Sequence, residues 1–192
     1  MIRGLSVGFA ITGSFCTIND ILDEVEKLVR EGANVYPILS ENVSSMDTRF
    51  TNTNELKEKL KEITKNNIID TIQKAEPIGP KALLDVLVVA PCTGNSIAKI
   101  ANGITDTTVT MAVKAQLRND RPVVLSISSN DALSSNGKNI GKLLNTKNIY
   151  FVPFYQDDPI GKSRSLVAKN TLILDTLKFA LGNKQIQPIF YS

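Results

Sequence analysis

The sequence predicts a single α/β domain built on a mostly parallel β-sheet. Short apolar runs rich in β-branched residues recur along the chain, and segments with helical spacing separate them. A strand followed by a helix, repeated, is the pattern of parallel βαβ units with right-handed crossovers. A chain of 192 residues with 42% hydrophobic content suits one domain with one core. We therefore expect a single domain over residues 1–192.

The expected strands and helices alternate along the chain. The strands are residues 5–11, 35–39, 86–90, 123–127 and 149–154. The helices are residues 18–31, 54–65, 96–102, 107–119, 139–144 and 166–181. The polar run 42–54 fits neither pattern, and we expect an ordered loop or a lid there.

The first predicted helix shows the helical pattern best. Its apolar residues fall three or four positions apart and form one stripe, opposite a charged face. Thr17 or Asn19 can cap its start, and Gly32 can take the left-handed conformation just past its end. The last predicted helix has a similar stripe, and Gly182 ends it.

Composition excludes several classes of function. The 22 basic and 19 acidic residues give a net charge of +3 and are scattered, which argues against a nucleic-acid partner. The longest apolar runs reach about half of the ~20 residues that a membrane span needs, and no signal peptide is evident, so we expect a cytoplasmic protein. The absence of histidine argues against zinc chemistry and Ser-His-Asp hydrolysis.

The chain has two cysteines, Cys16 and Cys92. In a reducing compartment we expect free thiols rather than a disulfide. Cys16 stands near a helix start, which can lower a thiol pKa, but a small buried thiol is the alternative.

Polar loops follow several of the predicted strands, at the sheet edge where open parallel sheets bind ligands. After the first strand, Gly13 permits a close approach of the backbone, and Ser14 offers a hydroxyl at a helix start, an arrangement that suits an anion. Ser40, after the second strand, can reach the same anion. An ordinary strand-to-helix turn is the alternative interpretation.

The loop after the third strand is the most informative. Thr93, Asn95 and Ser96 gather hydrogen-bonding side chains around a helix start, where backbone N–H groups are unpaired. A simple N-cap with nothing bound is the alternative. Two such loops on adjacent strands favour a phosphate-bearing cofactor. The loop after the fourth strand, residues 126–131, either contacts a ring or substrate or forms a capped turn.

Residues 90–106 read Ala-Pro-Cys-Thr-Gly-Asn-Ser-Ile-Ala-Lys-Ile-Ala-Asn-Gly-Ile-Thr-Asp. This run resembles the signature of the flavoprotein family that includes phosphopantothenoylcysteine decarboxylase, lantibiotic cysteine decarboxylases and prenyl-flavin synthases. Within that family, the runs 13–17, 48–50, 75–81, 130–133 and 146–154 are similar to the B subunits of dipicolinate synthase. Together these runs cover nearly the whole chain.

The resemblance implies a three-layer flavodoxin-like or Rossmann-like fold and a homo-oligomer, a trimer or an assembly of trimers, with FMN between subunits. Carried over by motif, the FMN phosphate is held by Gly13, Ser14 and Ser40. The cofactor site is also lined by Thr93, Asn95, Ser96 and Ser128. Ser128 stands where prenyl-flavin synthases carry an arginine.

The resemblance also implies an oxidoreductase subunit that acts in sporulation. The B subunits work with an A subunit, dependent on NADP or NAD, to form dipicolinic acid from a dihydrodipicolinate-type precursor of the lysine pathway. The candidate catalytic residues are Asn130 and Arg49. Arg49 can meet a substrate carboxylate with its planar fork of donors, although a surface arginine on a loop is the alternative.

The sequence departs from the decarboxylase pattern in the residues that carry the chemistry. Those enzymes use a catalytic histidine and a Pro-x-Met-Asn clamp, whereas this chain has no histidine and reads Ile-Ser-Ser-Asn at residues 127–130. Cysteine decarboxylation is therefore not expected. A flavin prenyltransferase would need a basic clamp and an aromatic platform, and neither is evident. A flavin-free scaffold subunit of the same complex is the remaining rival.

Overall fold

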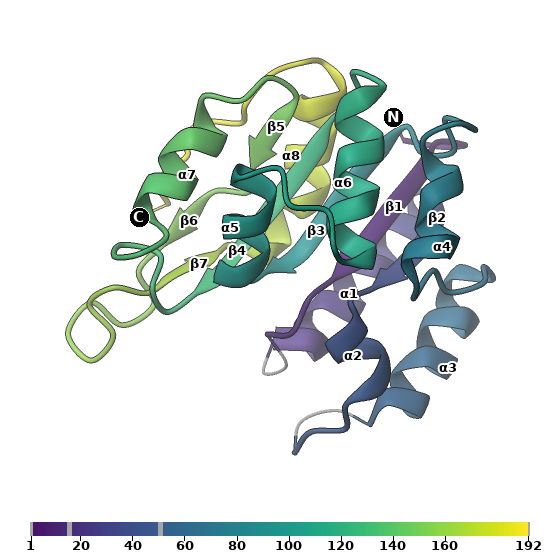
Figure 1. Cartoon of the computed structure of the whole chain (residues 1–192), viewed down its shortest axis with the longest axis horizontal. Coiled ribbons are helices and arrows are strands. Elements are labelled where there is room, and N and C mark those ends of the chain that lie inside the picture. The colour runs from purple at the N-terminus through teal and green to yellow at the C-terminus, as the bar shows by residue number, and fades with distance from the viewer. Residues whose placement is uncertain (1, 15–16, 50–51, 192) are drawn as a thin grey trace.

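The computed structural model describes residues 2–14, 17–49 and 52–191, which form a seven-stranded sheet with helices on both faces (Figure 1). Parallel strands make its main body in the order β2–β1–β3–β4–β5. Their bounds are Ser6–Ile11 (β1), Asn34–Leu39 (β2), Val86–Cys92 (β3), Val123–Ser129 (β4) and Ile149–Phe151 (β5). This is the strand order of doubly wound flavodoxin-like sheets, so the predicted fold class is confirmed.

Strand β4 changes partner along its length. Its first part pairs with β5 in parallel, and its last residues, Ser128 and Ser129, pair antiparallel with Val167 and Leu166. These two belong to β7, Leu166–Ala168, which pairs with β6, Phe154–Tyr155, in a hairpin. The hairpin therefore stands beside the carboxyl end of β4.

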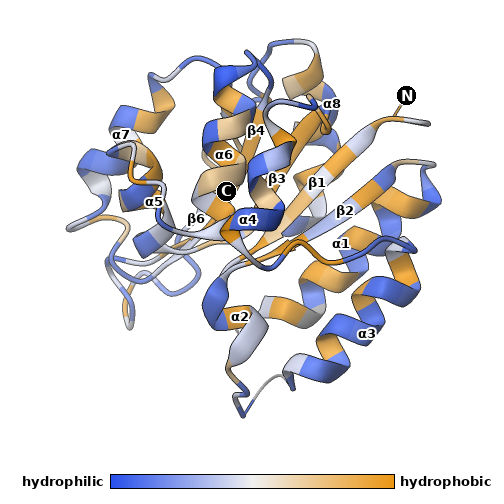
Figure 2. Ribbon diagram, turned by 45° about the vertical axis from the view of Figure 1, so that its right-hand side comes forward, coloured by the Kyte–Doolittle hydropathy of each residue, from blue (hydrophilic) through white to orange (hydrophobic). Residues whose placement is uncertain are grey.

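Helices cover both faces of the sheet (Figures 1 and 2). Helices α1 and α8 pack against each other on one face, and α3 lies beside α1 near β2. On the other face α6 contacts α4 and α5, and α5 contacts α7. The bounds are Ile18–Arg30 (α1), Glu41–Ser45 (α2), Thr53–Thr64 (α3), Ile72–Ala75 (α4), Gly94–Ala101 (α5), Thr108–Arg118 (α6), Gly137–Leu144 (α7) and Ile173–Leu181 (α8), with 3-10 turns at Glu76–Ile78 (η2) and Asn170–Leu172 (η3).

The core lies between the sheet and its helices. Every residue of β3 is buried, because helices cover both faces of this central strand. Its sequence is correspondingly apolar throughout, as expected for a parallel strand without a solvent-facing side. Figure 2 shows the contrast with the helices, whose apolar residues lie toward the sheet and whose polar residues lie outward.

The predicted helices before residue 166 are all present, with their ends shifted by two residues at most. The last prediction was wrong at its start: Leu166–Ala168 form β7, and the helix begins at Ile173. Pairing with Ser128 and Ser129 on one side and with Phe154 and Tyr155 on the other overrides the helical spacing there. The predicted strand 149–154 is likewise divided after Phe151, because Pro153 cannot donate a ladder hydrogen bond.

The predictions for the two ends of α1 and for the polar run 42–54 were confirmed in part. Gly32 has φ +88, as predicted for the end of α1. Thr17 stands at the N-cap position, but its hydroxyl donates to the Ser14 carbonyl at 2.9 Å instead of capping the helix. The side chain of Asn19 lies outside what the structure describes. The polar run 42–54 carries α2 at its start and the first residues of α3 at its end.

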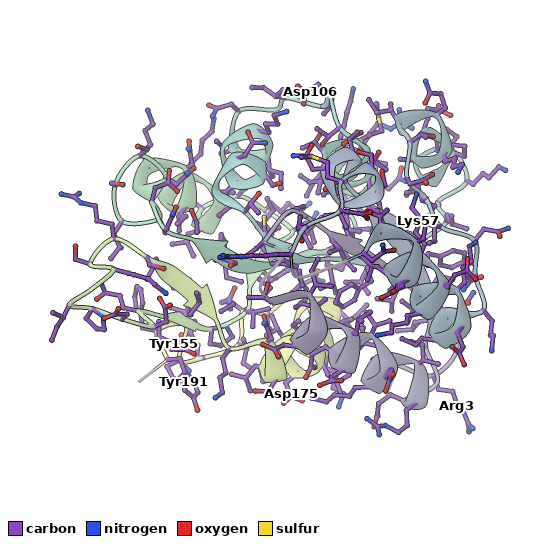
Figure 3. The ribbon with its side chains drawn as sticks, turned by 90° about the horizontal axis from the view of Figure 1, so that it is seen from below. Arg3, Lys57, Asp106, Tyr155, Asp175 and Tyr191 are labelled. Atoms are coloured by element: carbon purple, nitrogen blue, oxygen red, sulfur yellow. The ribbon has the colours of Figure 1, made fainter. Side chains whose placement is uncertain are left out.

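The outer edge of β5 is covered by the side chain of Gln185. Its carboxamide accepts from Phe151 N at 2.8 Å and donates to Phe151 O at 2.7 Å, as a neighbouring strand would. The chain end then runs along β6, where Tyr191 packs beside Tyr155 with ring centroids 5.9 Å apart (Figure 3). The C-terminal segment thus closes the sheet on this side.

Cys92, at the end of β3, is a buried free thiol, and burial raises its pKa to about 12. Cys16 lies outside the described residues, so its expected state stays a prediction. Within the described ranges, no helix combines the length and apolar character that a membrane span requires.

Candidate functional site

Two neighbouring cavities open at the carboxyl ends of the parallel strands. The larger cavity, about 770 Å³, lies over the loops after β1, β3 and β4 and is closed on one side by the β6–β7 hairpin. The smaller cavity, about 430 Å³, lies over the loops after β1, β2 and β3. They share Gly13, Thr93 and Asn95. The strand order reverses between β1 and β3, which is where doubly wound sheets bind their ligands.

Thr12 ties the loops after β1 and β3 together. Its buried hydroxyl donates to the Pro91 carbonyl at 2.7 Å and accepts from the Thr93 backbone N–H at 3.1 Å. These bonds hold Gly13 and Thr93 side by side at the boundary between the two cavities. Thr12 is not among the predicted site residues, because a threonine at a strand end cannot be distinguished by sequence from other β-branched strand residues.

A second tie crosses the larger cavity. The hydroxyls of Ser14 and Ser128 lie 2.8 Å apart, joining the loop after β1 to the end of β4. Ser128 is held there by its antiparallel pairing with Val167. The two serines that the sequence placed at separate loops are thus direct neighbours.

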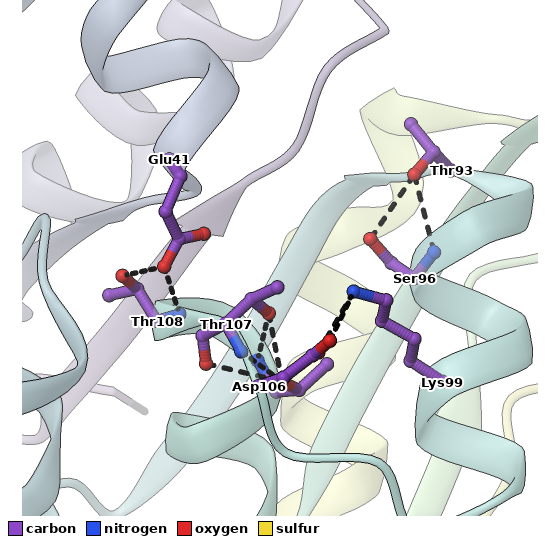
Figure 4. Close-up of polar contacts among 8 residues, drawn as sticks. Glu41, Thr93, Ser96, Lys99, Asp106, Thr107 and Thr108 are labelled. Carbon is purple, nitrogen blue, oxygen red and sulfur yellow. Dashed lines mark hydrogen bonds and ion pairs between the residues drawn. The ribbon is translucent and has the colours of Figure 1, made fainter.

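The start of α5 presents donors toward both cavities. Thr93 is the N-cap residue, and its hydroxyl lies 3.4 Å from Ser96 N and 3.1 Å from the Ser96 hydroxyl (Figure 4). Asn95 is exposed and Ser96 is buried. A helix start carries partial positive charge from its unpaired N–H groups, so this end favours an anion.

Ser40 lines the smaller cavity from the loop after β2. Its Oγ is buried and has no hydrogen-bond partner among the described residues. Ser40 is the N-cap residue of α2, yet its side chain makes no capping bond. A buried hydroxyl of this kind costs free energy unless a ligand or water completes it.

Asp131 anchors a polar chain beneath the larger cavity. Its carboxylate accepts from Ser129 Oγ and, at 3.0 and 2.9 Å, from Asn136 Nδ2. Asn139 continues the chain by donating to Asn136 at 2.8 Å. The hydrogen bond from Ser129 lowers the pKa of Asp131, so Asp131 is ionised at neutral pH.

Gly94 is required where α5 meets this chain. A Cβ at this position would lie 2.6 Å from Asp131 Oδ1, 2.6 Å from Ser129 Oγ and 2.8 Å from Asn136 Nδ2. The first turn of α5 therefore packs its backbone directly on the polar chain.

The β6–β7 hairpin brings opposite charges to the larger cavity. Lys162 Nζ lies 3.0 Å from Asp157 Oδ2, and both side chains line the cavity. The hydrogen bond from Lys162 lowers the pKa of Asp157. This pair is not among the predicted site residues, because it lies between the predicted strand 149–154 and the predicted helix 166–181.

The smaller cavity also carries both signs of charge. Lys99 Nζ lies 2.8 and 2.9 Å from the two carboxylate oxygens of Asp106 (Figure 4). Glu41 Oε1 accepts from Thr108 N and Thr108 Oγ1, each at 2.8 Å. All three charged side chains line the cavity.

The predicted site residues gather at these cavities, with one exception. The larger cavity is lined by Ser14, Ser128 and Asn130, the smaller by Ser40 and Ser96, and both by Gly13, Thr93 and Asn95. Asn130 is exposed at the rim of the larger cavity. Arg49 is exposed on the loop between α2 and α3 and lines neither cavity.

The doubly wound sheet carries hydroxyl-rich loops and a helix start at its switch point, which is where α/β proteins of this architecture bind their ligands. The model of the family described as Flavoprotein matches residues 1–176. The chain belongs to this family.

Within the family the chain is similar to the B subunit of dipicolinate synthase of Bacillus subtilis (strain 168), with 50% identity over 188 residues, 98% of this chain and 94% of the relative. The crystal structure of the dipicolinate synthase B subunit from Bacillus halodurans C matches with a TM-score of 0.92 and 48% identity, covering 100% of this chain and 98% of that one. The FMN-dependent cysteine decarboxylase TvaF, from thioviridamide biosynthesis, matches with a TM-score of 0.57 and 25% identity, covering 73% and 85%.

Proposed function

We propose that this chain is the B subunit of a dipicolinate synthase. In this role it acts with a nicotinamide-dependent A subunit, using NADP or NAD, to form dipicolinic acid from a dihydrodipicolinate-type precursor during sporulation. The observation that carries the proposal is the 50% identity to a dipicolinate synthase B subunit over 98% of the chain. Both chains match over nearly their full lengths, so the whole molecule and not one motif supports the assignment.

We further propose that the chain binds FMN across the two cavities. The buried Oγ of Ser40 supports this proposal. It has no hydrogen-bond partner among the described residues, and a phosphate oxygen would supply one. With Gly13 and Ser96, it gives the smaller cavity the hydroxyl and backbone donors that a phosphate needs. The larger cavity, between Ser14, Thr93 and Ser128, has room for the ring and a small substrate.

The chain's own residues would bind and orient the substrate. FMN would supply a hydride acceptor at N5. Lys162 lines the larger cavity and can bind a substrate carboxylate, with Asp157 limiting its position. Asn130 offers an amide at the rim of the same cavity. Arg49 would reach a carboxylate only by movement of its loop or from a neighbouring subunit.

The first test is an absorbance spectrum of the purified protein before and after addition of FMN, with free flavin removed by gel filtration. Stoichiometric retention of the flavin bands is the expected result. Replacing Ser14 and Ser96 together with leucine should abolish retention while the far-ultraviolet circular dichroism stays native. A folded double variant that retains flavin at the wild-type level would show that the site lies elsewhere.

A flavin-free scaffold subunit is the second candidate, and the charges of the cavities favour it. Among the described lining residues, Asp131, Asp157 and Glu41, with Asp106, outnumber Lys162 and Lys99. Excess negative charge opposes an anionic ligand. Dipicolinate formation by the A subunit with and without this chain, each with and without FMN, separates the two candidates: a scaffold raises the rate equally in both flavin conditions.

We propose that the protein is a homo-oligomer, a trimer or an assembly of trimers. A dodecameric FMN-dependent protein from Escherichia coli O157:H7 shares the fold at 16% identity and a TM-score of 0.61. Light scattering coupled to gel filtration measures the mass directly, and a multiple of three chains is the expected result.

A further inference from the structure

Lys99 stands at the smaller cavity on the second turn of α5. Its side chain is 22% exposed, whereas that of its partner Asp106 is 58% exposed. Figure 4 shows the lysine turned from the helix toward Asp106, in the connection that leads to Thr107 and α6. The aliphatic part of the Lys99 side chain thus packs against the protein. Its ammonium group pairs with the exposed carboxylate of Asp106.

Lys99 supplies the cationic side chain among the described residues that line the smaller cavity. The cavity's other carboxylate, Glu41, already accepts two hydrogen bonds from Thr108. The unpartnered hydroxyl of Ser40 lines the same cavity. A cation, a buried hydroxyl and a helix start around one space are the components of a phosphate site.

We propose that Lys99 is the counter-ion of the FMN phosphate, and that Asp106 holds the lysine in the flavin-free protein and competes with the phosphate for it. This inference rests on the proposed FMN binding. Lys99 would exchange Asp106 for the phosphate by rotation of its flexible side chain. An ammonium bonds as a point charge, so it does not need a fixed geometry with either partner. An ion pair with an exposed carboxylate contributes little stability, so the exchange costs little.

Asp106 competes with the phosphate for Lys99 through its ionised carboxylate. The hydrogen bond from Lys99 lowers the pKa of Asp106, so Asp106 carries its charge at neutral pH. Asp106 should therefore reduce the affinity for FMN without affecting riboflavin, which lacks the phosphate. The pair would set how strongly the protein prefers the phosphorylated flavin.

The test is a titration of the full chain with FMN and with riboflavin, followed by quenching of flavin fluorescence. The variants are Lys99→Met, Lys99→Arg, Asp106→Asn and the double variant Lys99→Met with Asp106→Asn. Lys147→Met and Asp120→Asn are controls for the loss of one charge, because Lys147 and Asp120 form an exposed ion pair of similar length, 2.9 Å, outside both cavities. Thermal unfolding of each variant shows that it is folded.

We expect Lys99→Met to weaken FMN binding about tenfold or more, the value of a charge-assisted hydrogen bond, and to leave riboflavin binding unchanged. Lys99→Arg should retain most of the preference. Asp106→Asn should strengthen FMN binding several-fold, and this gain should vanish in the double variant.

Two outcomes overturn the proposal and are distinct from each other. In the first, the wild-type chain binds FMN, and Lys99→Met weakens the binding of FMN and riboflavin equally or weakens neither. Lys99 then does not contact the phosphate, while the FMN assignment stands. If the wild-type chain binds neither flavin, the FMN assignment and this inference fail together.

Discussion

Ser40 and Thr53 each bury a hydroxyl that has no hydrogen-bond partner among the described residues, but of the two only Ser40 lines one of the two cavities of the candidate site. Since Ser40→Ala removes no hydrogen bond, the free energy of unfolding should stay within about 1 kcal/mol of wild type. Flavin retention should fall, because the proposed phosphate site loses a donor. Thr53→Val is the matched control and should change neither quantity. Equal flavin retention by both variants would exclude Ser40 from the site.

Gly94 and Gly141 are both helical glycines, yet alanine should act in opposite directions at the two positions. At Gly94 the new Cβ meets Asp131 and Ser129, so Gly94→Ala should destabilise the protein by about 1–3 kcal/mol. At Gly141, inside α7, a Cβ meets nothing within 4 Å, so Gly141→Ala should stabilise by about 0.5–1 kcal/mol. Urea denaturation measures both; a neutral Gly94→Ala would mean that the first turn of α5 can shift.

The candidate-site residues that could be predicted from the sequence are those that follow a strand closely. Gly13 and Ser14 follow β1, and Thr93 follows β3 as the N-cap residue of α5, so their place at the sheet edge follows from the strand positions. Thr12 and Lys99 were not recognised as site residues. Their roles depend on partners far along the chain or on a fold-dependent cavity, which periodicity does not encode.

At the scale of elements, the contact between α1 and α8 buries a glutamate. Burial raises the pKa of Glu24 above its ordinary value of 4.5, although Lys27 lies 3.4 Å away and opposes the shift. In the window from 4.5 up to the raised pKa, the folded protein binds more protons than the unfolded chain. The free energy of unfolding from this group therefore falls as pH rises through that window.

Glu24→Gln should remove this part of the pH dependence. We expect its stability to fall less than that of wild type as pH rises from 4.5 toward neutrality, as measured by urea denaturation at several pH values. Glu58→Gln, in an exposed pair with Lys61 of the same i,i+3 type, controls for the loss of one charge. A Glu24→Gln profile parallel to that of wild type would contradict the assignment.

The main elements could be predicted because their patterns are long or strongly apolar. α1 keeps the helical spacing without interruption, and β3 is a continuous apolar run. The β6–β7 hairpin could not be predicted, since β6 has two residues and β7 has three. Strands this short are defined by their pairing, β7 with Ser128 and Ser129 and β6 with β7, and not by their own sequence.

At the scale of the whole molecule, alternation predicted a parallel sheet, but the strand order was implied by the family resemblance and not by periodicity. The two cavities arise from this order. Loops after β1 and β3 lie 81 positions apart at Thr12 and Thr93, yet they share a hydrogen bond because the order reverses between the two strands. Separate loops become one site only through the topology.

Gln185 also acts at the scale of the whole molecule, because its side chain joins the C-terminal segment to β5. Gln185→Ala should destabilise the whole protein by about 1–3 kcal/mol, because it leaves the N–H and C=O of Phe151 without their partner. Gln185→Glu keeps the acceptor and loses the donor, so its loss should be smaller at low pH, where a protonated carboxyl can donate. Thermal unfolding ranks the variants; wild-type stability in both would mean that solvent replaces the side chain.

The same contact has a consequence for behaviour at high concentration. An uncovered β5 would offer one molecule's backbone as a template for a strand from the next, the first step toward linear aggregates. One glutamine occupies that template with its own amide. At Phe151 the backbone groups of β5 are therefore not available to a strand of another molecule, which disfavours open-ended polymer growth along this edge of the sheet.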